Sequence, residues 1–277
     1  MRSRSLHGGR HELGQNFLRD RRTIDRIVGL VRATDGPILE IGAGDGALTR
    51  GLAALGRDVL AVDLDERRVD GLRRRLPSVT VRQADALRVR LDRPVIVGNI
   101  PFHLTTPILR RSLAADGWRE AIFLTQWEVA RKRAGVGGRT MMTAQTAPWF
   151  DFALHGRVAA GAFIPRPSVD AGILAISRRA TPLVAPADRR AYERFVHAVF
   201  TGPGRGIGQI LALATPGPRP SRRAALAAAA LDPTALPRDL TPGQWATLWH
   251  LLGRPVNDQA TSPPGGRPAS QPRGNRR

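Results

Sequence analysis

The chain has 277 residues, of which 42% are hydrophobic, and it contains no cysteine. These values allow one large or two modest domains with a proper core, and they exclude disulfides, thiolate metal sites and a cysteine nucleophile. No run approaches the roughly 18 consecutive apolar residues of a membrane-spanning helix, and no apolar run follows the basic N-terminus as in a secretory signal. We therefore expect a cytoplasmic protein without a membrane partner.

Charge is the strongest compositional signal. The chain has 43 Lys and Arg against 23 Asp and Glu, a net charge of +20, and Lys132 is its only lysine. Arginine pairs with phosphate through two parallel hydrogen bonds and stacks on bases, so this surplus favours a nucleic-acid partner. A GC-rich genome would explain the choice of Arg over Lys, but it would not explain the surplus over acidic residues.

Apolar periodicity predicts alternating strands and helices between about residues 20 and 182. The expected strands cover 37–44, 58–65, 79–85, 94–99 and 120–126, and the expected helices cover 23–31, 47–55, 66–76, 106–114 and 127–134. Two later segments, 150–160 and 169–179, could form an antiparallel pair that closes the sheet. The pattern predicts an α/β fold with a doubly wound, mainly parallel, seven-stranded sheet, whose ligands lie at the carboxyl ends of the strands.

The composition and pattern of the sequence change after the predicted α/β domain of residues 20–182. Short apolar segments separated by Pro and Gly predict a small helical domain over 186–253, whose arginines could face nucleic acid. Residues 254–277 are rich in Pro, Gly and Arg, a composition typical of disorder. Residues 1–19 form a separate basic segment. Because the six histidines are scattered, we expect no metal site.

The stretch "EIGAGDGALT" (40–49) places glycines where a predicted strand turns into a helix. Glycine lets a ligand lie against the backbone, and a helix N-terminus supplies free N–H groups. Gly42 and Gly44 also fit the dinucleotide-binding pattern, with Asp63 lying 21 residues beyond Gly42. The motif by itself therefore does not separate a nicotinamide dinucleotide from S-adenosylmethionine.

Three acidic residues near this turn favour S-adenosylmethionine. Asp45 stands at the helix start, where it would repel a pyrophosphate but tolerate a ligand with a cationic sulfonium. Asp63 can accept hydrogen bonds from both ribose hydroxyls, and Asp85 can accept one from the adenine amino group. The alternative is that each Asp merely caps a helix or turn at the end of its strand.

The stretch "GNIPF" (98–102) follows the fourth predicted strand and suggests a site for an aminated base. Two acceptors can hold the N–H groups of an exocyclic amine and turn its lone pair towards a methyl donor. The Asn99 side-chain oxygen is one candidate, and a backbone carbonyl fixed by Pro101 is the other. Phe102 offers a stacking face for the base, a contact worth about 1–3 kcal/mol. The alternative is a proline turn with Phe102 packed in the core.

With these motifs the sequence resembles the ribosomal RNA adenine N6-methyltransferases. The resemblance covers roughly residues 10–252, and it rests on "LGQNFL" (13–18), "EIGAGDGALT", "GNIPF" and "FIPRPSVD" (163–170), in family order and at family-like spacing. It implies a Rossmann-like methyltransferase domain that uses S-adenosylmethionine. Two branches of the family come into question, the macrolide-resistance methyltransferases and the small-subunit dimethyladenosine transferases.

The resemblance also implies roles for individual residues. The N-terminal segment would close over the cofactor, and Phe163 would cover the second face of the target base. The implied cofactor-binding residues are Gln15, Asn16, Leu18, Gly42, Gly44, Asp63, Asp85, Ala86 and Asn99. The implied residues at the target base are Asn99, Ile100, Pro101, Phe102 and Phe163. One departure is that Asp63 stands where many resistance enzymes carry Glu, which keeps the charge on a shorter side chain.

The fourth motif, "NIPFHLT", is closer to the resistance branch than to the "NLPYNIS" of the small-subunit enzymes. The resistance branch implies as target the macrolide-contacting adenine of 23S rRNA, where methyl groups would obstruct macrolides, lincosamides and type B streptogramins. The target base must be splayed out, because a duplex buries its amine. The same turn serves for adding one methyl group or two.

The basic stretch "ARKRAGVGGR" (130–139) is the candidate for gripping RNA phosphates, although a solvated loop would show the same composition. The expected RNA-binding residues are Arg131, Lys132, Arg133, Arg139 and Arg166.

We expect a monomer. The remaining alternatives are a small-subunit rRNA dimethyltransferase, an NAD-dependent oxidoreductase, and an RNA-binding protein on a methyltransferase scaffold without catalytic activity.

Overall fold

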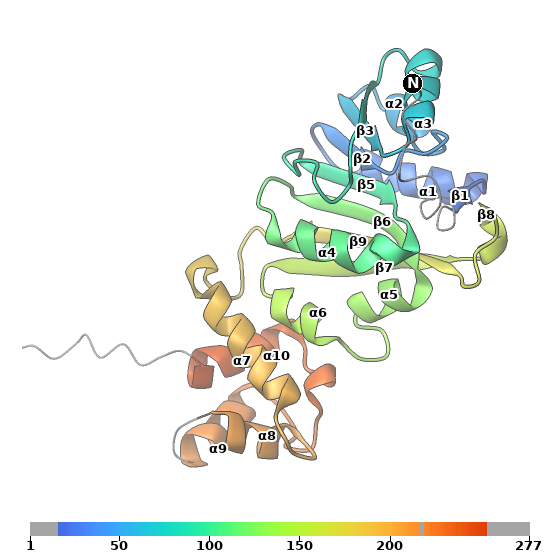
Figure 1. Ribbon diagram of the computed structural model, residues 1–277. Coiled ribbons are helices and arrows are strands. Elements are labelled where there is room, and N and C mark those ends of the chain that lie inside the picture. The colour runs from blue at the N-terminus through green and yellow to red at the C-terminus, as the bar shows by residue number, and fades with distance from the viewer. Residues whose placement is uncertain (1–15, 216–218, 254–277) are drawn as a thin grey trace, which may run out of the picture.

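A computed structural model describes residues 16–215 and 219–253. Its centre is a seven-stranded sheet in the order β4-β3-β2-β5-β6-β9-β7 (Figure 1). The strands are β2 (Ile38–Ile41), β3 (Val59–Asp63), β4 (Thr80–Gln83), β5 (Val95–Asn99), β6 (Glu120–Gln126), β7 (Phe150–Val158) and β9 (Ala171–Arg178). The first five strands in this order are parallel, and β9 pairs antiparallel with both β6 and β7. The predicted fold and its closing antiparallel pair are confirmed.

Helices follow most strands, as the alternation predicted. They are α1 (Arg21–Arg32), α2 (Thr49–Ala53), α3 (Glu66–Arg75), α4 (Thr105–Ala114), α5 (Trp127–Arg133) and α6 (Met141–Thr146). The first helix begins where the Asp20 carboxylate accepts the Thr23 backbone N–H at 2.8 Å, and it buries Ile27 and Val31. The short α6 was not predicted, because six residues offer too little periodicity to detect.

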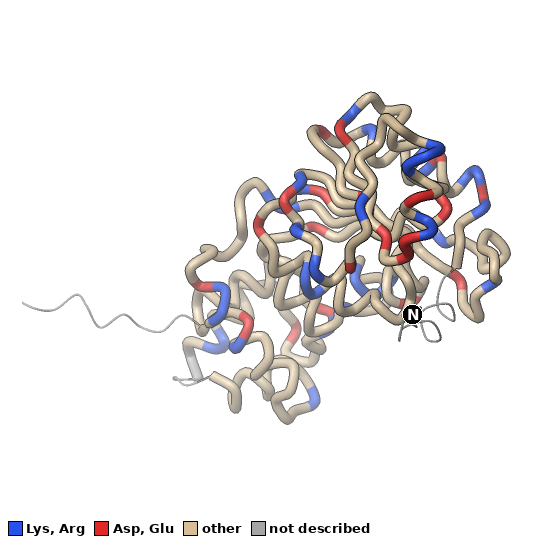
Figure 2. The backbone as a smooth tube through the Cα atoms, turned by 45° about the horizontal axis from the view of Figure 1, so that its top comes forward, with Lys and Arg blue, Asp and Glu red and all other residues tan. Residues whose placement is uncertain are grey.

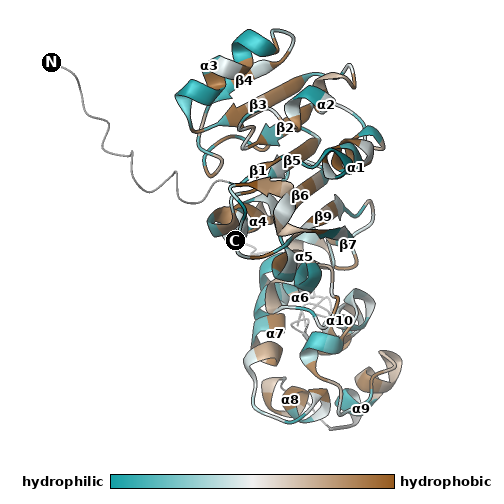
Figure 3. Ribbon diagram, turned by 90° about the vertical axis from the view of Figure 1, so that its right-hand side faces the viewer, coloured by the Kyte–Doolittle hydropathy of each residue, from teal (hydrophilic) through white to brown (hydrophobic). Residues whose placement is uncertain are grey.

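The central strands are buried on both faces, so their sequences read as continuous apolar runs. One hydrophobic cluster contains Leu39 and Ile41 of β2, and a second contains Ile38 of the same strand. Figure 3 shows the central strands as largely hydrophobic and α3 as largely hydrophilic. Most of the special residues that the sequence singled out lie at the strand ends, outside these two clusters.

A second, two-stranded sheet joins the N-terminal segment to a later turn. Here β1 (Phe17–Leu18) pairs antiparallel with β8 (Phe163–Ile164). The backbone N–H groups of Arg19 and Asp20 both donate to the Ala162 carbonyl, at 2.8 and 3.3 Å. Strands of two residues carry no readable period, so this pairing of two of the recognised motifs was not predicted.

The helical region contains α7 (Arg189–Thr201), α8 (Ile207–Ala214), α9 (Arg219–Ala228) and α10 (Pro242–Leu248), and a final helical turn at Trp249–Gly253. It lies beyond the β7 edge of the sheet (Figure 1). None of the described helices is long and apolar enough to cross a membrane. The predicted tail, 254–277, lies outside the described residues.

Aromatic side chains join the helical region to the sheet in one continuous core. Tyr192 of α7 meets Trp149 edge-on with ring centroids 5.4 Å apart, and it meets Trp249 at 5.7 Å. The Tyr192 hydroxyl donates to the Ala144 carbonyl of α6 at 3.0 Å. The predicted boundary near residue 186 therefore separates an α/β region from a helical region, and the two share one hydrophobic core.

The carboxyl group of Glu40 is buried within the central sheet. Glu40 of β2 is 1% exposed, and its Oε2 has no hydrogen-bond partner among the described residues. Burial raises the pKa of Glu40 to about 8, and the neighbouring Asp63 carboxylate acts in the same direction. Glu40 is therefore mainly protonated at pH 7.

This raised pKa predicts a pH dependence of stability. Between pH 4.5 and 8 the unfolded chain ionises Glu40 while the folded chain keeps it protonated, so the folded state loses stability as the pH rises. We expect Glu40→Gln to remove this loss. The difference in free energy of unfolding between Glu40→Gln and the wild type should shift in favour of the variant by about 3–4 kcal/mol from pH 5 to pH 8. Urea unfolding curves at the two pH values measure this difference. A pH-independent difference would contradict the assignment.

Candidate functional site

A cavity of about 90 Å³ opens at the carboxyl ends of β2, β3 and β5. It is lined by Asn16, Phe17, Leu18, Arg19, Glu40, Gly42, Ala43, Gly44, Asp45, Ala47, Leu48, Arg50, Asp63, Asn99, Ile100, Pro101 and Phe102. Three of the recognised motifs therefore meet in one place, although they are far apart in the sequence. This is the edge at which a doubly wound sheet binds ligands.

The glycine turn forms one wall of the cavity. Gly42 and Gly44 have φ angles of +71° and +52°, in the region that favours glycine. A Cβ on Gly44 would lie 3.3 Å from the Phe17 ring, and one on Gly42 would lie 3.5 Å from the Asn99 carbonyl. The turn therefore needs glycine both for its backbone angles and for the close approach of the N-terminal strand.

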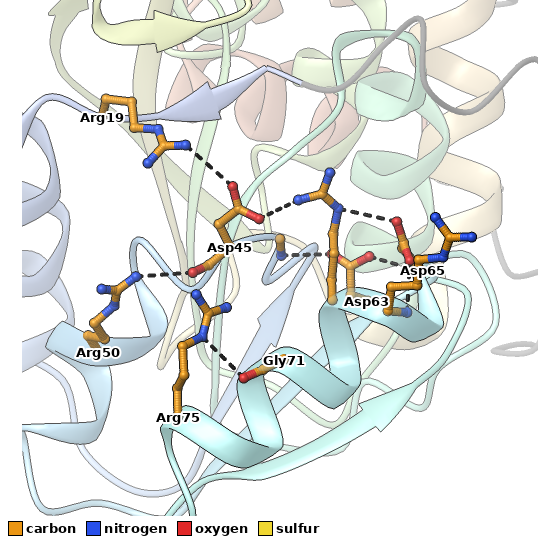
Figure 4. Close-up of polar contacts among 10 residues, drawn as sticks. Arg19, Asp45, Arg50, Asp63, Asp65, Gly71 and Arg75 are labelled. Atoms are coloured by element: carbon orange, nitrogen blue, oxygen red, sulfur yellow. Dashed lines mark hydrogen bonds and ion pairs between the residues drawn. The ribbon is translucent and has the colours of Figure 1, made fainter.

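Asp63 holds the glycine turn from the end of β3. It is 7% exposed, and its Oδ2 accepts the Gly44 N–H at 2.7 Å while its Oδ1 accepts the Asp65 N–H at 2.9 Å (Figure 4). A carboxylate oxygen can accept more than one hydrogen bond, so both oxygens keep capacity for a ligand. Asp63 thus shapes the cavity and also presents acceptors to it.

Asp45 was expected from the sequence to carry an unpaired negative charge. In the structure its charge is paired. Its carboxylate forms an ion pair with Arg68 of α3 and a second one with Arg19 at 3.5 Å (Figure 4). Arg68 also lies 3.3 Å from Asp65, and its guanidinium stands 4.2 Å from the centre of the Phe17 ring. The two arginines offset the charge of Asp45, so Asp45 would not repel a pyrophosphate as the sequence suggested.

Asn99 sits at the end of β5, beside the glycine turn. Its Nδ2 donates to the Asn16 carbonyl at 2.8 Å, and no described residue donates to its Oδ1. This one hydrogen bond fixes the orientation of the amide and leaves the oxygen as an available acceptor. Both Asn99 and Asn16 were expected at this site from the sequence, but the hydrogen bond between them was not.

The turn after Asn99 provides the second acceptor. The Pro101 carbonyl already accepts the Leu104 N–H at 2.8 Å, whereas the Ile100 carbonyl accepts none from the described residues. The Ile100 N–H donates to the Leu124 carbonyl at 3.0 Å, which anchors this peptide to β6. Ile100 therefore supplies the available carbonyl, and the half-buried Phe102 lines the cavity next to it.

Several expected site residues lie away from the cavity. Asp85 Oδ1 accepts the Leu87 N–H at 2.8 Å, so it caps a turn, and neither Asp85 nor Ala86 lines the cavity. Phe163 is 2% exposed and packs in the core beside the N-terminal strand. In this conformation these three residues do not contact the cavity, and Gln15 lies outside the described residues.

The candidate RNA-binding cations differ in their availability. The prediction that Arg133 binds RNA phosphates was wrong. Its side chain is 9% exposed and hydrogen-bonds Thr140, so it is buried. Arg131 is paired with Glu128 at 2.7 Å. By contrast, Lys132 and Arg166 are exposed and Arg139 is half-buried. Figure 2 shows Lys and Arg spread over both parts of the molecule.

Among the cavity residues that were not anticipated from the sequence, Glu40 and Phe17 stand out. Glu40 carries a buried carboxyl oxygen without a described partner, and Phe17 covers the glycine turn. The signal for Glu40 was present, because a lone acid within the apolar run "PILEIG" is unusual for a strand that is buried on both faces. Phe17 gave no signal, since its position depends on the pairing of β1 with β8.

Known proteins are similar to this chain over nearly its whole length. The model of the family described as ribosomal RNA adenine dimethylase matches residues 6–252. A mycinamicin-resistance protein, MyrB, of Micromonospora griseorubida is 49% identical over 88% of this chain and 79% of its own length. An rRNA adenine N-6-methyltransferase of Corynebacterium diphtheriae is 52% identical over 73% of this chain and 82% of its own.

The fold is also similar to that of a known rRNA methyltransferase. The crystal structure of the 23S rRNA methyltransferase ErmE superimposes with a TM-score of 0.79 at 37% identity, covering 86% of this chain and all of that one. Family model, relatives and fold thus agree with the resemblance drawn from the four motifs. The chain therefore belongs to the ribosomal RNA adenine dimethylase family and is an rRNA adenine N6-methyltransferase.

Proposed function

We propose that this enzyme transfers a methyl group from S-adenosylmethionine to the N6 amine of one adenine in 23S rRNA, in the peptidyl-transferase region. The modification would confer resistance to macrolides, lincosamides and type B streptogramins by occupying their contact surface. The observation that carries the proposal is the Asn99 amide, whose NH2 group is bound to Asn16 and whose oxygen stays available beside the glycine turn.

The acceptor groups that line the cavity suit S-adenosylmethionine. Asp63 and the glycine turn offer acceptors and a close backbone approach on one side. Glu40 adds a buried oxygen without a described partner, which suits a ligand with a polar group that can hydrogen-bond to it. When bound, this cofactor supplies an activated methyl group. Asp63 would hold the ribose, and Asp85 with Ala86 remains our proposal for the adenine.

The other wall of the cavity suits an adenine amine. The amine proton becomes acidic once the methyl group has arrived, so the site needs acceptors and no strong base. Asn99 Oδ1 and the Ile100 carbonyl are the two available acceptors, and the peptide of Ile100 is fixed to β6. Orientation and electrostatics would thus do the work of a catalytic acid or base. Phe102 would stack on the base, and Phe163 would cover its other face.

Access to the cavity requires the N-terminal strand to move. Ligand pockets usually measure about 300–1,000 Å³, whereas this cavity encloses about 90 Å³. Phe17 occupies part of the space, lying over Gly44 and beneath Arg68. Displacing residues 16–19, which are held by short β1, Asn99 and Arg68, would open the glycine turn. The same residues would then close over the bound cofactor.

The resistance branch is favoured over small-subunit dimethylation by the relatives. One of the two relatives reported above is named for antibiotic resistance, and the similar crystal structure is a 23S rRNA methyltransferase. The motif "NIPFHLT" points the same way. A nicotinamide-dependent oxidoreductase has no support beyond the glycine pattern. A non-catalytic RNA-binding role is disfavoured because the acceptors at Asn99 and Asp63 are intact.

The direct test is to incubate the enzyme with labelled S-adenosylmethionine and either protein-free 23S rRNA or 30S subunits. Primer extension and mass spectrometry then locate the modified adenine and count its methyl groups. We expect label in 23S rRNA at a single adenine. Label confined to the small-subunit RNA would favour the other branch, and label in neither would contradict the proposal.

The role of Asn99 predicts a specific loss. We expect Asn99→Ala to lower the rate of methylation by about 100-fold or more, because one of the two amine acceptors is lost. Binding of S-adenosylhomocysteine, measured by calorimetry, should change by less than about threefold. Thr80→Ala, at the exposed amino end of β4, is the control and should keep both properties. An Asn99→Ala enzyme of near-normal rate would rule out the acceptor role.

The stacking role of Phe102 predicts a graded series. Phe102→Ala should lower kcat/KM by roughly 10- to 100-fold, which corresponds to a loss of about 1–3 kcal/mol of base stacking. Phe102→Tyr and Phe102→Trp should keep most of the activity, because they keep an aromatic face. Phe200→Ala serves as a control for lost core packing, since Phe200 stacks on Trp245 far from the cavity. Equal losses for Ala, Tyr and Trp would argue against stacking.

A further inference from the structure

The guanidinium of Arg68 contacts three segments that border the cavity. It forms an ion pair with Asp45 of the glycine turn and another with Asp65, the N-cap residue of α3, at 3.3 Å. It also stands 4.2 Å from the centre of the Phe17 ring in β1. The Arg68 side chain is only 24% exposed, so these contacts are partly shielded from water. One side chain of α3 therefore connects the N-terminal strand to the turn that this strand covers.

Phe17 lies between the Arg68 guanidinium and the glycine turn. A Cβ added to Gly44 would meet two carbons of the Phe17 ring at 3.3 Å, which is closer than ordinary van der Waals contact. Two residues further on, Arg19 forms its own ion pair with Asp45, at 3.5 Å. The ring thus covers the part of the turn where glycine lets a ligand lie against the backbone.

In this position the Phe17 ring competes for space with a cofactor that lies against the glycine turn. Such a cofactor must displace the ring from Gly44, because the ring already stands close to this backbone. Displacing the ring also breaks its contact with Arg68, whose guanidinium is held in place by Asp45 and Asp65. The contacts that Arg68 makes therefore favour the covered turn over the cofactor-bound one.

We propose that Arg68 is a positioning residue that holds Phe17 over the glycine turn, and that it thereby weakens the binding of S-adenosylmethionine and S-adenosylhomocysteine. The proposal rests on the proposed function and deepens it. The apparent affinity of a ligand falls in proportion to the fraction of the protein that is able to bind it. A partly exposed ion pair and a cation–π contact together change such a fraction by about three- to thirtyfold.

Calorimetry with S-adenosylhomocysteine measures this effect directly. We expect Arg68→Gln to bind this ligand about three- to thirtyfold more tightly than the wild type, because Phe17 leaves the turn more readily. A residue that merely supports the fold would change the affinity in the opposite direction when it is replaced. Arg67→Gln is the matched control, because Arg67 is an exposed arginine in the same turn of α3. Its affinity should equal that of the wild type.

Two further variants show whether Arg68 acts through Phe17. Phe17→Ala should itself tighten binding, and Arg68→Gln should have little further effect when it is added to Phe17→Ala. This non-additivity is the signature of two residues that act through one contact. Arg68→Lys should keep an affinity close to that of the wild type, because the charge beside Asp45 and the Phe17 ring is kept.

The outcomes separate this inference from the proposed function. If the wild type binds S-adenosylhomocysteine and Arg68→Gln binds it equally or more weakly at an unchanged thermal midpoint, the role of Arg68 is overturned and the proposed function stands. Wild-type enzyme that binds neither S-adenosylhomocysteine nor S-adenosylmethionine contradicts the proposed function itself. If Arg68→Gln does not fold, Phe17→Ala decides: tighter binding than in the wild type supports the role, and equal or weaker binding overturns it.

Discussion

The parallel register of β2 with β3 and β5 is the constraint on which the site depends. Ile41 pairs with Val62 and Glu40 with Val97, so the three strands end at the same level. The glycine turn follows β2, while Asp63 and Asn99 are the last residues of β3 and β5, so the three meet where their strands end. A shift of one residue in either pairing would reverse the faces of all the side chains of that strand and separate the acceptors from the turn.

A second constraint is the contact between Asn99 and the N-terminal strand. The hydrogen bond to the Asn16 carbonyl orients the Asn99 amide, and the same segment carries Phe17 onto the glycine turn. The group proposed to position the target amine and the group that covers the cofactor cavity are therefore mechanically connected. Movement of the strand that admits the cofactor would release the Asn99 amide, and return of the strand would orient it again.

The sequence predicted the architecture well because strand-and-helix alternation and the glycine turn are local signals. It missed features that arise from contacts between distant side chains. Arg133 belongs to a basic stretch, yet its burial beside Thr140 follows from the position of α6, which the sequence did not reveal. Asp45 was taken as a free charge because its partner Arg68 lies on the next helix. The pairing of β1 with β8 joins segments about 145 residues apart, for which two-residue strands carry no pattern.

The helical region is connected to the catalytic sheet in two different ways. Tyr192 and its aromatic neighbours form a buried core with Trp149, whereas Arg139 and Arg238 meet at the surface through one backbone hydrogen bond. The buried connection resists rotation, because protein interiors are closely packed. The surface connection then fixes the backbone at Arg238 relative to the loop after α5. Two contacts of different kinds thus hold the helical region in one orientation relative to the sheet that carries the cavity.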